Sequence, residues 1–304
     1  MTVAVAGGTG FVGGAIAREL VGRGEHVVVL THRSPTAGRR VPAGADVRQA
    51  DVNGDPGALD RALAGVDALA IALAFPNAPM DNPARGWTYE HVDADGTEAL
   101  MGAARRAGVR RVVYVSGAGA AKDAPRHWFR AKWRAEQAVK ASTVTYTIIR
   151  PTWIYGPGDV SLNRFLGFAR WLPFVPLTGS GTQQLAPVFI DDVARLAADA
   201  LADPAAADQT FELGGPDTFT MRQIVGIALE VSGKRRPVLP APAFLLRAAA
   251  HVLQHLPGRV LTPDGVDFVN QPAVVDTGPL LAAMPRRLTP LREGLGTYLG
   301  AKAG

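Results

Sequence analysis

The sequence contains no cysteine among its 304 residues. Without thiols the chain can form no disulfide, no thiolate metal site and no cysteine nucleophile, a composition that fits a cytoplasmic protein. Long apolar runs are missing as well, because Ala68–Phe75 is only strand-sized and Arg and His interrupt Phe244–Leu256. We therefore expect no membrane span. We also expect no signal peptide, because the N-terminus enters an apolar strand almost at once.

The sequence also lacks the features of a metal site or of a nucleic-acid interface. No set of His, Asp or Glu residues has metal-ligand spacing, and Asp191-Asp192 open a helix, where helix capping explains them better. The net charge is +5 and the pI is near 9.8, but the arginines are scattered through the predicted helices. A nucleic-acid interface would gather them in one stripe. The expected partner is therefore a small molecule, with no metal and no nucleic acid, and the sequence does not define an oligomeric state.

The first thirteen residues contain the most informative motif. A β-branched apolar run, Met1–Ala6, ends at Gly7-x-x-Gly10-x-x-Gly13, and an Ala/Leu-rich helical pattern follows. The first two glycines of this motif are separated by two residues, one more than in the common G-x-G-x-x-G fingerprint. Glycines let the backbone approach a pyrophosphate, and the following helix N-terminus offers free N–H groups and positive dipole. The sequence thus predicts a dinucleotide site whose phosphate-loop contacts are Gly7, Thr9, Gly10, Phe11, Val12 and Gly13.

Strand and helix patterns alternate along the first two-thirds of the chain. This alternation predicts an α/β fold with a Rossmann-type, doubly wound parallel sheet. We expect an NAD(P)-binding domain over residues 1–155, completed by 188–213. Residues 156–187 and 214–304 form a smaller, interleaved region that caps the substrate. The predicted strands are Val3–Ala6, Val27–Leu30, Asp46–Gln49, Ala68–Leu73, Arg111–Val115, Thr145–Ile149 and Thr210–Leu213, and the predicted helices of the domain are Gly13–Gly22, Pro56–Leu63, Thr97–Ala107, Phe129–Ala141 and Asp191–Leu201.

The end of the second strand indicates which nucleotide binds. NAD sites place a carboxylate here, whereas NADP sites place an arginine near the 2′-phosphate. The strand ends Thr31-His32-Arg33-Ser34, without a carboxylate. Arg33 can bind a 2′-phosphate with its guanidinium, and Thr31 and Ser34 can add hydroxyl donors. NADP(H) is the preferred cofactor and NAD(H) remains possible.

Asp51-Val52 follows the third predicted strand, where side chains can meet the adenine. Asp51 has a second interpretation, because it can instead cap the helix that begins near Pro56.

Several further motifs carry a family resemblance. With the glycine loop, Asp51-Val52, Tyr114-Val115-Ser116, Lys132, Arg150-Pro151 and Tyr155-Gly156-Pro157-Gly158-Asp159, the chain resembles the extended and atypical branches of the short-chain dehydrogenase/reductase superfamily. Leu261–Asp264 and Arg292–Leu295 are most similar to the atypical group that includes the NADPH-binding accessory subunit of respiratory complex I. The resemblance implies that Lys132 and Pro151 lie at the cofactor.

The chain departs from this family at two catalytic positions. Active members have a Tyr four residues before the Lys, and a Ser at the end of the fifth strand. Here Trp128 occupies the Tyr position, and an indole N–H is far too weak an acid to replace a phenol. Ala118 stands where the Ser is expected. Ser116 comes too early and is expected to pack at the strand end.

The remaining candidates for chemistry are Lys132 and Tyr155. Lys132 either holds the nicotinamide ribose, as the resemblance implies, or acts as a general base with a pKa lowered by burial. Tyr155 is either a substitute acid or a packing residue. Aromatic residues outnumber charged ones around the expected pocket, so the ligand is expected to be largely apolar. The same aromatics could equally be core packing. The predicted substrate pocket includes Trp87, Ser116, Trp128 and Trp153.

These features together predict an NADP(H)-dependent oxidoreductase-like enzyme of the atypical type. Its expected substrate is a small, rather apolar carbonyl, quinone or enone compound. Because two catalytic residues are replaced, two alternatives stay open. One is a non-catalytic NADP(H)-binding sensor or assembly subunit, and the other is a non-redox isomerase or cyclase on the same scaffold.

Overall fold

The computed structural model describes residues 1–32, 41–75, 81–253 and 263–300. The chain divides into two compact units. The first consists of Met1–Pro151, Ile190–Leu213 and Asp276–Arg286. The second consists of Thr152–Phe189, Gly214–Val275 and Arg287–Gly304. Among the described residues, no helix is long and apolar enough to cross a membrane.

The domain boundaries differ from the sequence prediction at three places. Residues 152–155 and 188–189, predicted in the first domain, lie in the second unit. Residues 276–286 were assigned to the capping region, whereas the structure returns them to the first unit. There α10 (Gly278–Ala283) packs on β11 (Gln209–Leu213), and the Arg286 guanidinium forms an ion pair with Asp199. Neither contact leaves a local pattern in the sequence.

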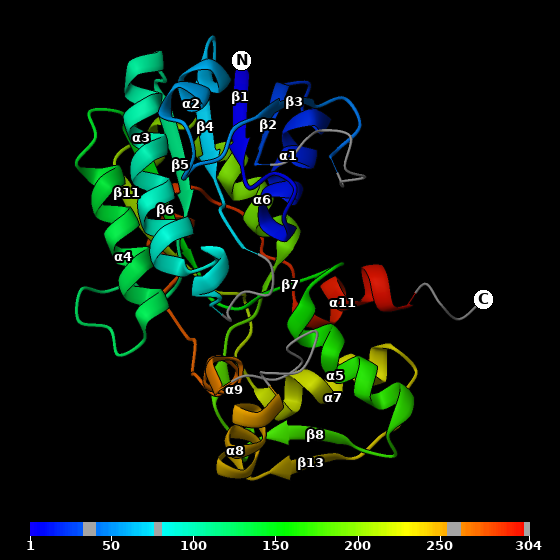
Figure 1. The fold of residues 1–304 in the computed structure, drawn as a ribbon. Helices are drawn as coiled ribbons and strands as arrows, with labels where there is room; N and C mark the ends of the chain where they lie inside the picture. Colours follow the sequence, from blue (N-terminus) through cyan, green and yellow to red (C-terminus); the bar gives the residue numbers. More distant parts are fainter. Residues whose placement is uncertain (33–40, 76–80, 254–262, 301–304) are drawn as a thin grey trace. The chain divides into compact units, whose positions relative to one another are not determined.

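The first unit is built on a seven-stranded sheet in the order β11-β6-β5-β4-β1-β2-β3, and every neighbouring pair is parallel. Figure 1 shows α3 and α4 on one side of this sheet and α1 and α6 on the other. The predicted doubly wound fold is confirmed. Its strands and helices are β1 (Thr2–Ala6), β2 (His26–Thr31), β3 (Asp46–Gln49), β4 (Ala68–Ile71), β5 (Arg111–Val115), β6 (Thr145–Pro151), β11, α1 (Phe11–Gly22), α2 (Pro56–Leu63), α3 (Gly96–Ala107), α4 (His127–Lys140), α6 (Ile190–Ala200) and α10.

The central strands explain why this sheet forms. Residues Val3–Ala6 of β1 are all buried, because helices cover both faces of a parallel sheet. The chain leaves β1 toward β2 on one side, and β4 occupies the other side. This reversal of strand order is the place where open α/β sheets bind ligands, outside the carboxyl ends of the strands.

The segment before α3 has an uncommon conformation. Residues Tyr89–Asp95 form a π-helical segment, η2, that continues directly into α3. The Thr88 side chain starts it by accepting a hydrogen bond from the His91 N–H at 3.0 Å. Asp95 precedes α3 but forms no side-chain cap there, because the preceding residues are already helical. π-helical segments are rare and are found frequently at functional sites.

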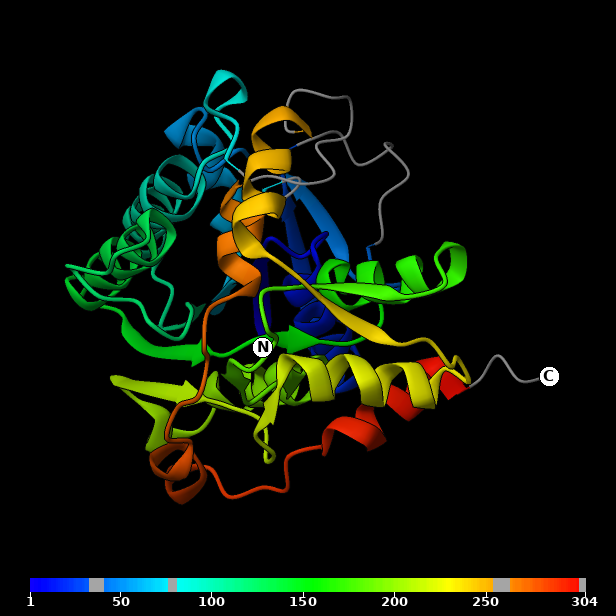
Figure 2. The same cartoon turned by 90° about the horizontal axis from the view of Figure 1, so that it is seen from below.

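The second unit contains three two-stranded sheets, β10-β7, β12-β9 and β13-β8. Figure 2 shows α11 alongside α7, and β8 beside β13. A capping box between Thr220 and Gln223 starts α7. The elements of this unit are β7 (Ile154–Tyr155), α5 (Val160–Trp171), β8 (Val175–Thr178), β9 (Gln184–Leu185), β10 (Val188–Phe189), β12 (Phe219–Thr220), α7 (Met221–Val231), β13 (Val238–Ala241), α8 (Ala243–Leu253), α9 (Pro263–Val269) and α11 (Leu291–Leu299).

Candidate functional site

The three glycines of the loop between β1 and α1 have different surroundings. Gly7 has a φ of +81°, and a Cβ there would lie 2.1 Å from the Ala72 carbonyl oxygen. A Cβ on Gly13 would lie 2.3 Å from the Gly7 carbonyl oxygen. Gly10 is exposed, and its nearest such contact is the Gly7 oxygen at 3.1 Å. Gly7 therefore makes the turn, Gly13 lets the helix pack on the loop, and Gly10 presents bare backbone to a ligand.

The N-terminus of α1 has the properties of an anion site. Its N-cap is Gly10, no side chain caps it, and no acidic residue lies in its first turn. The Gly14 N–H makes the first hydrogen bond of the helix, to the Gly10 oxygen at 3.0 Å. The preceding N–H groups have no acceptor within the helix. Half-buried Thr9, Phe11 and Val12 complete the loop. These residues fit a dinucleotide pyrophosphate.

The described part of the predicted 2′-phosphate site is the end of β2. Thr31 is buried there, and its carbonyl oxygen accepts a hydrogen bond from the Ala50 N–H at 2.9 Å. Arg33 and Ser34 lie outside the described residues. Thr31 and His32, which end the described strand, carry no negative charge that would repel a phosphate.

The end of β3 tests the helix-capping interpretation of Asp51, while its contact with adenine stays a prediction. Asp55 caps α2 by accepting a hydrogen bond from the Gly57 N–H at 2.9 Å, so capping by Asp51 is wrong. Asp51 is exposed and accepts from the Asn53 N–H at 3.0 Å in its own turn. Val52 packs against Gly96, where a Cβ would lie 2.7 Å from the Val52 side chain.

Lys132 of α4 forms a buried ion pair with Asp93 of η2. Its Nζ contacts Asp93 Oδ1 and also lies 3.5 Å from the Val115 carbonyl oxygen, at the carboxyl end of β5. The Asp93 carboxylate is 1% exposed and the Lys132 side chain is 14% exposed. Two residues later on α4, the Arg134 guanidinium donates a hydrogen bond to the Asp95 carboxylate at 2.6 Å. Two cations of α4 thus hold η2 in place.

The charge on Asp93 is poorly compensated by its surroundings. Burial raises the pKa of Asp93, and the Lys132 ammonium offsets part of that rise. Asp93 Oδ2 has no hydrogen-bond partner among the described residues. Asp93 was not identified as a site residue from the sequence. An aspartate just before a predicted helix, here between Val92 and Ala94, has the same sequence pattern as an ordinary helix cap. A buried carboxylate with a raised pKa beside a lysine is typical of a functional site.

Tyr114 lies beneath the same lysine. The Lys132 Nζ is 5.4 Å from the centre of its ring, and the tyrosine is fully buried. Burial, followed by the carboxylates of Asp93 and Glu136, raises the pKa of Tyr114 well above its ordinary value. This phenol therefore stays neutral and is not an activated acid.

Trp128, at the family's Tyr position, is part of an aromatic cluster. It is 2% exposed, with ring centres 5.1 Å from His127 and 6.5 Å from Tyr89. Phe75 meets Tyr89 edge-to-face at 4.9 Å. Because Trp128 precedes Lys132 by one helical turn, this cluster forms an apolar wall next to the ion pair. The aromatic residues were predicted either to line a ligand pocket or to pack in the core. Trp128 is packed against its aromatic neighbours and is almost completely buried.

Ser116 belongs to a second buried ionic network. Its Oγ donates to Glu136 at 2.6 Å, and the Arg150 guanidinium donates to both oxygens of Glu136, at 2.8 and 2.6 Å. Arg150 also reaches Glu212 at 3.1 Å. Glu136 is completely buried. This network joins β5, α4, β6 and β11 and occupies the Ser116 hydroxyl.

The other predicted residues of the first unit lie at its loops. The Pro151 carbonyl oxygen, at the end of β6, accepts a hydrogen bond from the Ala118 N–H at 2.9 Å. Trp87 stacks beneath the Arg85 guanidinium, which lies 5.0 Å from its ring centre.

Tyr155 and Trp153 belong to the second unit. Tyr155 is fully buried, and its hydroxyl donates to the Pro290 carbonyl oxygen at 3.4 Å, while Trp153 is half-buried. Among the described residues, no cluster of His, Asp or Glu could hold a metal ion.

A protein-family model described as NAD(P)H-binding matches residues 7–204. The chain belongs to this family. The predicted resemblance is confirmed at the level of an NAD(P)H-binding family, whose relatives include a subunit of mitochondrial NADH dehydrogenase and a ceramide reductase.

Two curated relatives and one solved structure illustrate the range of this NAD(P)H-binding family. The chain is 30% identical over 250 residues to the mitochondrial NADH dehydrogenase [ubiquinone] 1 alpha subcomplex subunit 9 of Arabidopsis thaliana, covering 81% of this chain and 62% of that subunit. It thus spans about three-fifths of that relative's length. It is 29% identical over 300 residues to the ceramide reductase of Caulobacter vibrioides, covering 97% and 82% of the two chains.

The solved structure is the NADPH-dependent quinone oxidoreductase QOR2 of Escherichia coli in complex with NADPH. Its TM-score is 0.74 at 22% identity, with 98% of this chain and 99% of that chain covered. At this identity the similarity establishes the fold.

Proposed function

We propose that the chain is an NADP(H)-dependent oxidoreductase of the atypical type that reduces a small, rather apolar carbonyl, quinone or enone compound. The observation that carries this proposal is the buried Lys132–Asp93 ion pair at the carboxyl edge of a sheet that also has an open glycine phosphate loop. A protein that only stored a nucleotide would not need a desolvated carboxylate next to the lysine.

The residues that would hold the cofactor follow from the loop geometry. Gly10 and the first turn of α1 would bind the pyrophosphate, and Thr31 would face the adenosine ribose. When bound, NADPH supplies a hydride to the substrate carbon. Lys132 would then face the nicotinamide ribose, the substrate oxygen, or both.

Lys132 is the only retained proton carrier of the family's catalytic set. Its ammonium can give one proton to a substrate oxygen that gains negative charge as the hydride adds to carbon, and water then returns a proton to the amine. Asp93 stabilises the ammonium between turnovers. Trp128 contributes an apolar wall and no proton.

The apolar substrate is supported by the aromatic cluster of Trp128, Tyr89 and Phe75 next to this ion pair. It is also supported by two reductive relatives, named as a ceramide reductase and a quinone oxidoreductase. The preference for NADP(H) is supported by the absence of a carboxylate at the end of β2.

The test is NADPH oxidation against a panel of ketones, quinones and enones, with Lys132→Ala, Lys132→Arg and Asp93→Asn beside the wild type. If Lys132 is the proton carrier, both lysine variants lose turnover, because arginine does not deprotonate at working pH. Lys132→Arg then keeps much of its affinity for NADPH. If Lys132 only positions the ribose, Lys132→Arg retains most of the turnover. Turnover that survives Lys132→Ala undiminished would contradict the proposed site.

A second candidate function is a nucleotide-binding sensor or assembly subunit. It is favoured by Trp128 and Ala118, which replace the acid and the serine, and by the similarity to NADH dehydrogenase subunits. This function predicts NADPH that stays bound through purification and no turnover with any member of the panel.

A further inference from the structure

The outer surface of α5 exposes large apolar side chains. The inner face of the helix is buried through Leu162, Phe165, Leu166 and Ala169. On the outer face Phe168 is 36% exposed and Trp171 is 81% exposed. Just beyond the helix, Leu172 and Phe174 are also exposed. Several large apolar residues gathered in one exposed place mark an interaction site rather than ordinary surface.

Cationic side chains surround these aromatics. Arg164 and Arg170 are exposed on α5, and the Arg170 guanidinium lies 5.4 Å from the centre of the Trp171 ring. No described residue forms an ion pair with Arg164. The two arginines frame the apolar residues on the same helix.

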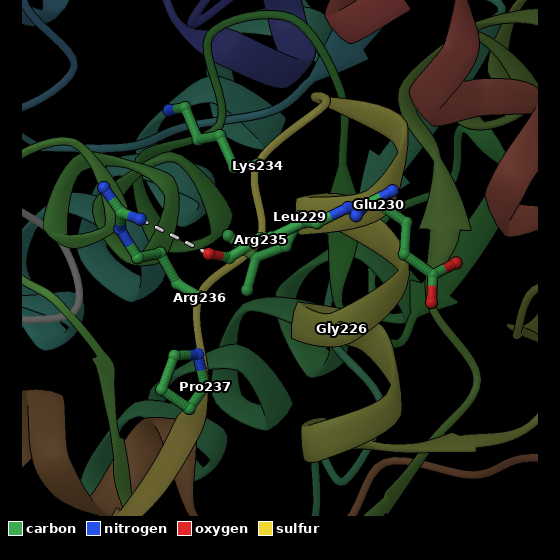
Figure 3. Close-up of a pocket in the computed structure, with 7 residues that line it drawn as sticks. All are labelled: Gly226, Leu229, Glu230, Lys234, Arg235, Arg236 and Pro237. Atoms are coloured by element: carbon green, nitrogen blue, oxygen red, sulfur yellow. Dashed lines mark hydrogen bonds between the residues drawn. The ribbon is translucent and has the colours of Figure 1, made fainter.

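A second basic segment, Lys234-Arg235-Arg236, lies next to α5. The Lys234 Nζ donates to the Leu166 carbonyl oxygen of α5 at 3.1 Å. The Val175 N–H donates to the Pro237 oxygen at 2.9 Å, so the parallel register continues to bring Pro237 opposite Phe174 and Arg236 opposite Pro173. Figure 3 shows the Lys234 and Arg236 side chains pointing to the same side, away from Glu230, whereas the Arg235 side chain points toward Glu230. These residues line a shallow hollow of about 450 Å³.

Negative charge is absent from both segments. Residues 160–174 and 233–241 contain no Asp or Glu. Glu230, the acidic residue in the hollow, is engaged by Arg292 at 2.7 Å. The surface formed by Arg164, Phe168, Trp171, Phe174 and Arg236, here called the α5 surface, is therefore both apolar and cationic.

We propose that the α5 surface docks the protein on a membrane that contains anionic phospholipid. Aromatic side chains insert at the boundary between headgroups and acyl chains, and arginines pair with lipid phosphates at the same depth. A Trp beside an Arg is suited to this boundary, because each has an apolar body and a polar end. A second copy of the chain fits less well, since it would bring the same arginines face to face.

The test is co-sedimentation with vesicles of phosphatidylcholine alone and of phosphatidylcholine mixed with phosphatidylglycerol. We expect binding to the anionic vesicles, weak binding to the neutral ones, and release by high salt. Trp171→Ala with Phe174→Ala should abolish binding. Arg164→Glu with Arg236→Glu should weaken it about 25-fold or more, because each cation near an anionic surface contributes about fivefold. Arg105→Glu, an exposed charge reversal on α3, should leave it unchanged.

Tryptophan fluorescence gives an independent readout. Anionic vesicles should shift the emission of the wild type to shorter wavelength, and Trp171→Phe should lose that shift while it still binds. Circular dichroism confirms that each variant is folded. Equal binding to neutral and anionic vesicles, no binding at all, or binding unaffected by the α5-surface variants would overturn the proposal. A wild-type dimer that dissociates in Trp171→Ala, Phe174→Ala would assign the surface to self-association instead.

Discussion

Substitutions at two glycines of the loop should affect different properties. Gly13→Ala should mainly lower stability, and Gly10→Ala should mainly lower the affinity for NADPH. At Gly13, alanine would place its Cβ 2.3 Å from the Gly7 oxygen and 2.6 Å from the Gly7 carbonyl carbon. Both are backbone atoms, so α1 must move away from the loop. Overpacking of this kind costs about 1–3 kcal/mol or more of unfolding free energy.

At Gly10 the same methyl group meets only the Gly7 oxygen, at 3.1 Å, and the φ of −87° suits any residue. Gly10→Ala should cost about 0.5–1 kcal/mol, the price of a poorer N-cap. If the loop binds the cofactor as proposed, this Cβ would instead occupy the place of the pyrophosphate. We expect NADPH affinity to fall about tenfold or more, which corresponds to about 1.4 kcal/mol, and Gly10→Val should lose still more.

Urea unfolding measures the stability of both variants, and NADPH fluorescence titration measures their affinity. Gly13→Ala should have the larger stability loss, and Gly10→Ala should unfold close to the wild type while binding NADPH poorly. Gly10→Ala that binds as tightly as the wild type would show that the phosphate loop is wrongly assigned. A stability loss as large as that of Gly13→Ala would show that the assigned roles of the two glycines are wrong.

Three further outcomes are expected. Glu136→Ala should lose about 3–5 kcal/mol in urea unfolding by leaving the Arg150 charge uncompensated, whereas Arg106→Ala, which breaks an exposed pair with Asp60, should lose at most about 1 kcal/mol. Burial raises the pKa of Asp159 from 3.8 to about 6, so its protonation stabilises the fold at low pH and that contribution, about 3 kcal/mol, is lost as the pH rises through 6. Asp159→Asn, which keeps a capping side chain, should remove this pH dependence in unfolding measurements from pH 4 to 7. Arg33→Ala should weaken the binding of NADPH by roughly 1.5–3 kcal/mol and should hardly change the binding of NADH, as measured by parallel titrations. Equal losses of affinity for both cofactors would contradict the NADP(H) preference.

The regular elements of the first unit were predictable because their signals are local. Residues 46–49, 56–63 and 111–115 were predicted with the bounds that the structure gives. In α2, Asp55 and Pro56 fix the helix start through contacts within three residues. In β5 the apolar, valine-rich run Val112–Val115 needs no partner to be recognised as a buried strand.

The chemistry around Lys132 was only half predictable. Its position four residues after Trp128 could be found from the family pattern, but its partner Asp93 lies 39 residues earlier, in a π-helical segment that no spacing announces. Ser116 shows the same limit, because its acceptor Glu136 is brought to it by the packing of α4 on the sheet. Long-range pairing of buried charges depends on the finished fold and leaves no periodic signal.

The central claim is that NADPH bound at this site gives a hydride to an apolar acceptor with the help of Lys132. The most direct measurement uses NADPH deuterated at the transferred position of the nicotinamide C4, incubated with the panel of ketones, quinones and enones. Mass spectrometry then follows deuterium into the product. We predict transfer to at least one class of acceptor by the wild type and loss of transfer in Lys132→Ala. Tight NADPH binding without transfer to any acceptor, or transfer unchanged in Lys132→Ala, would contradict the account.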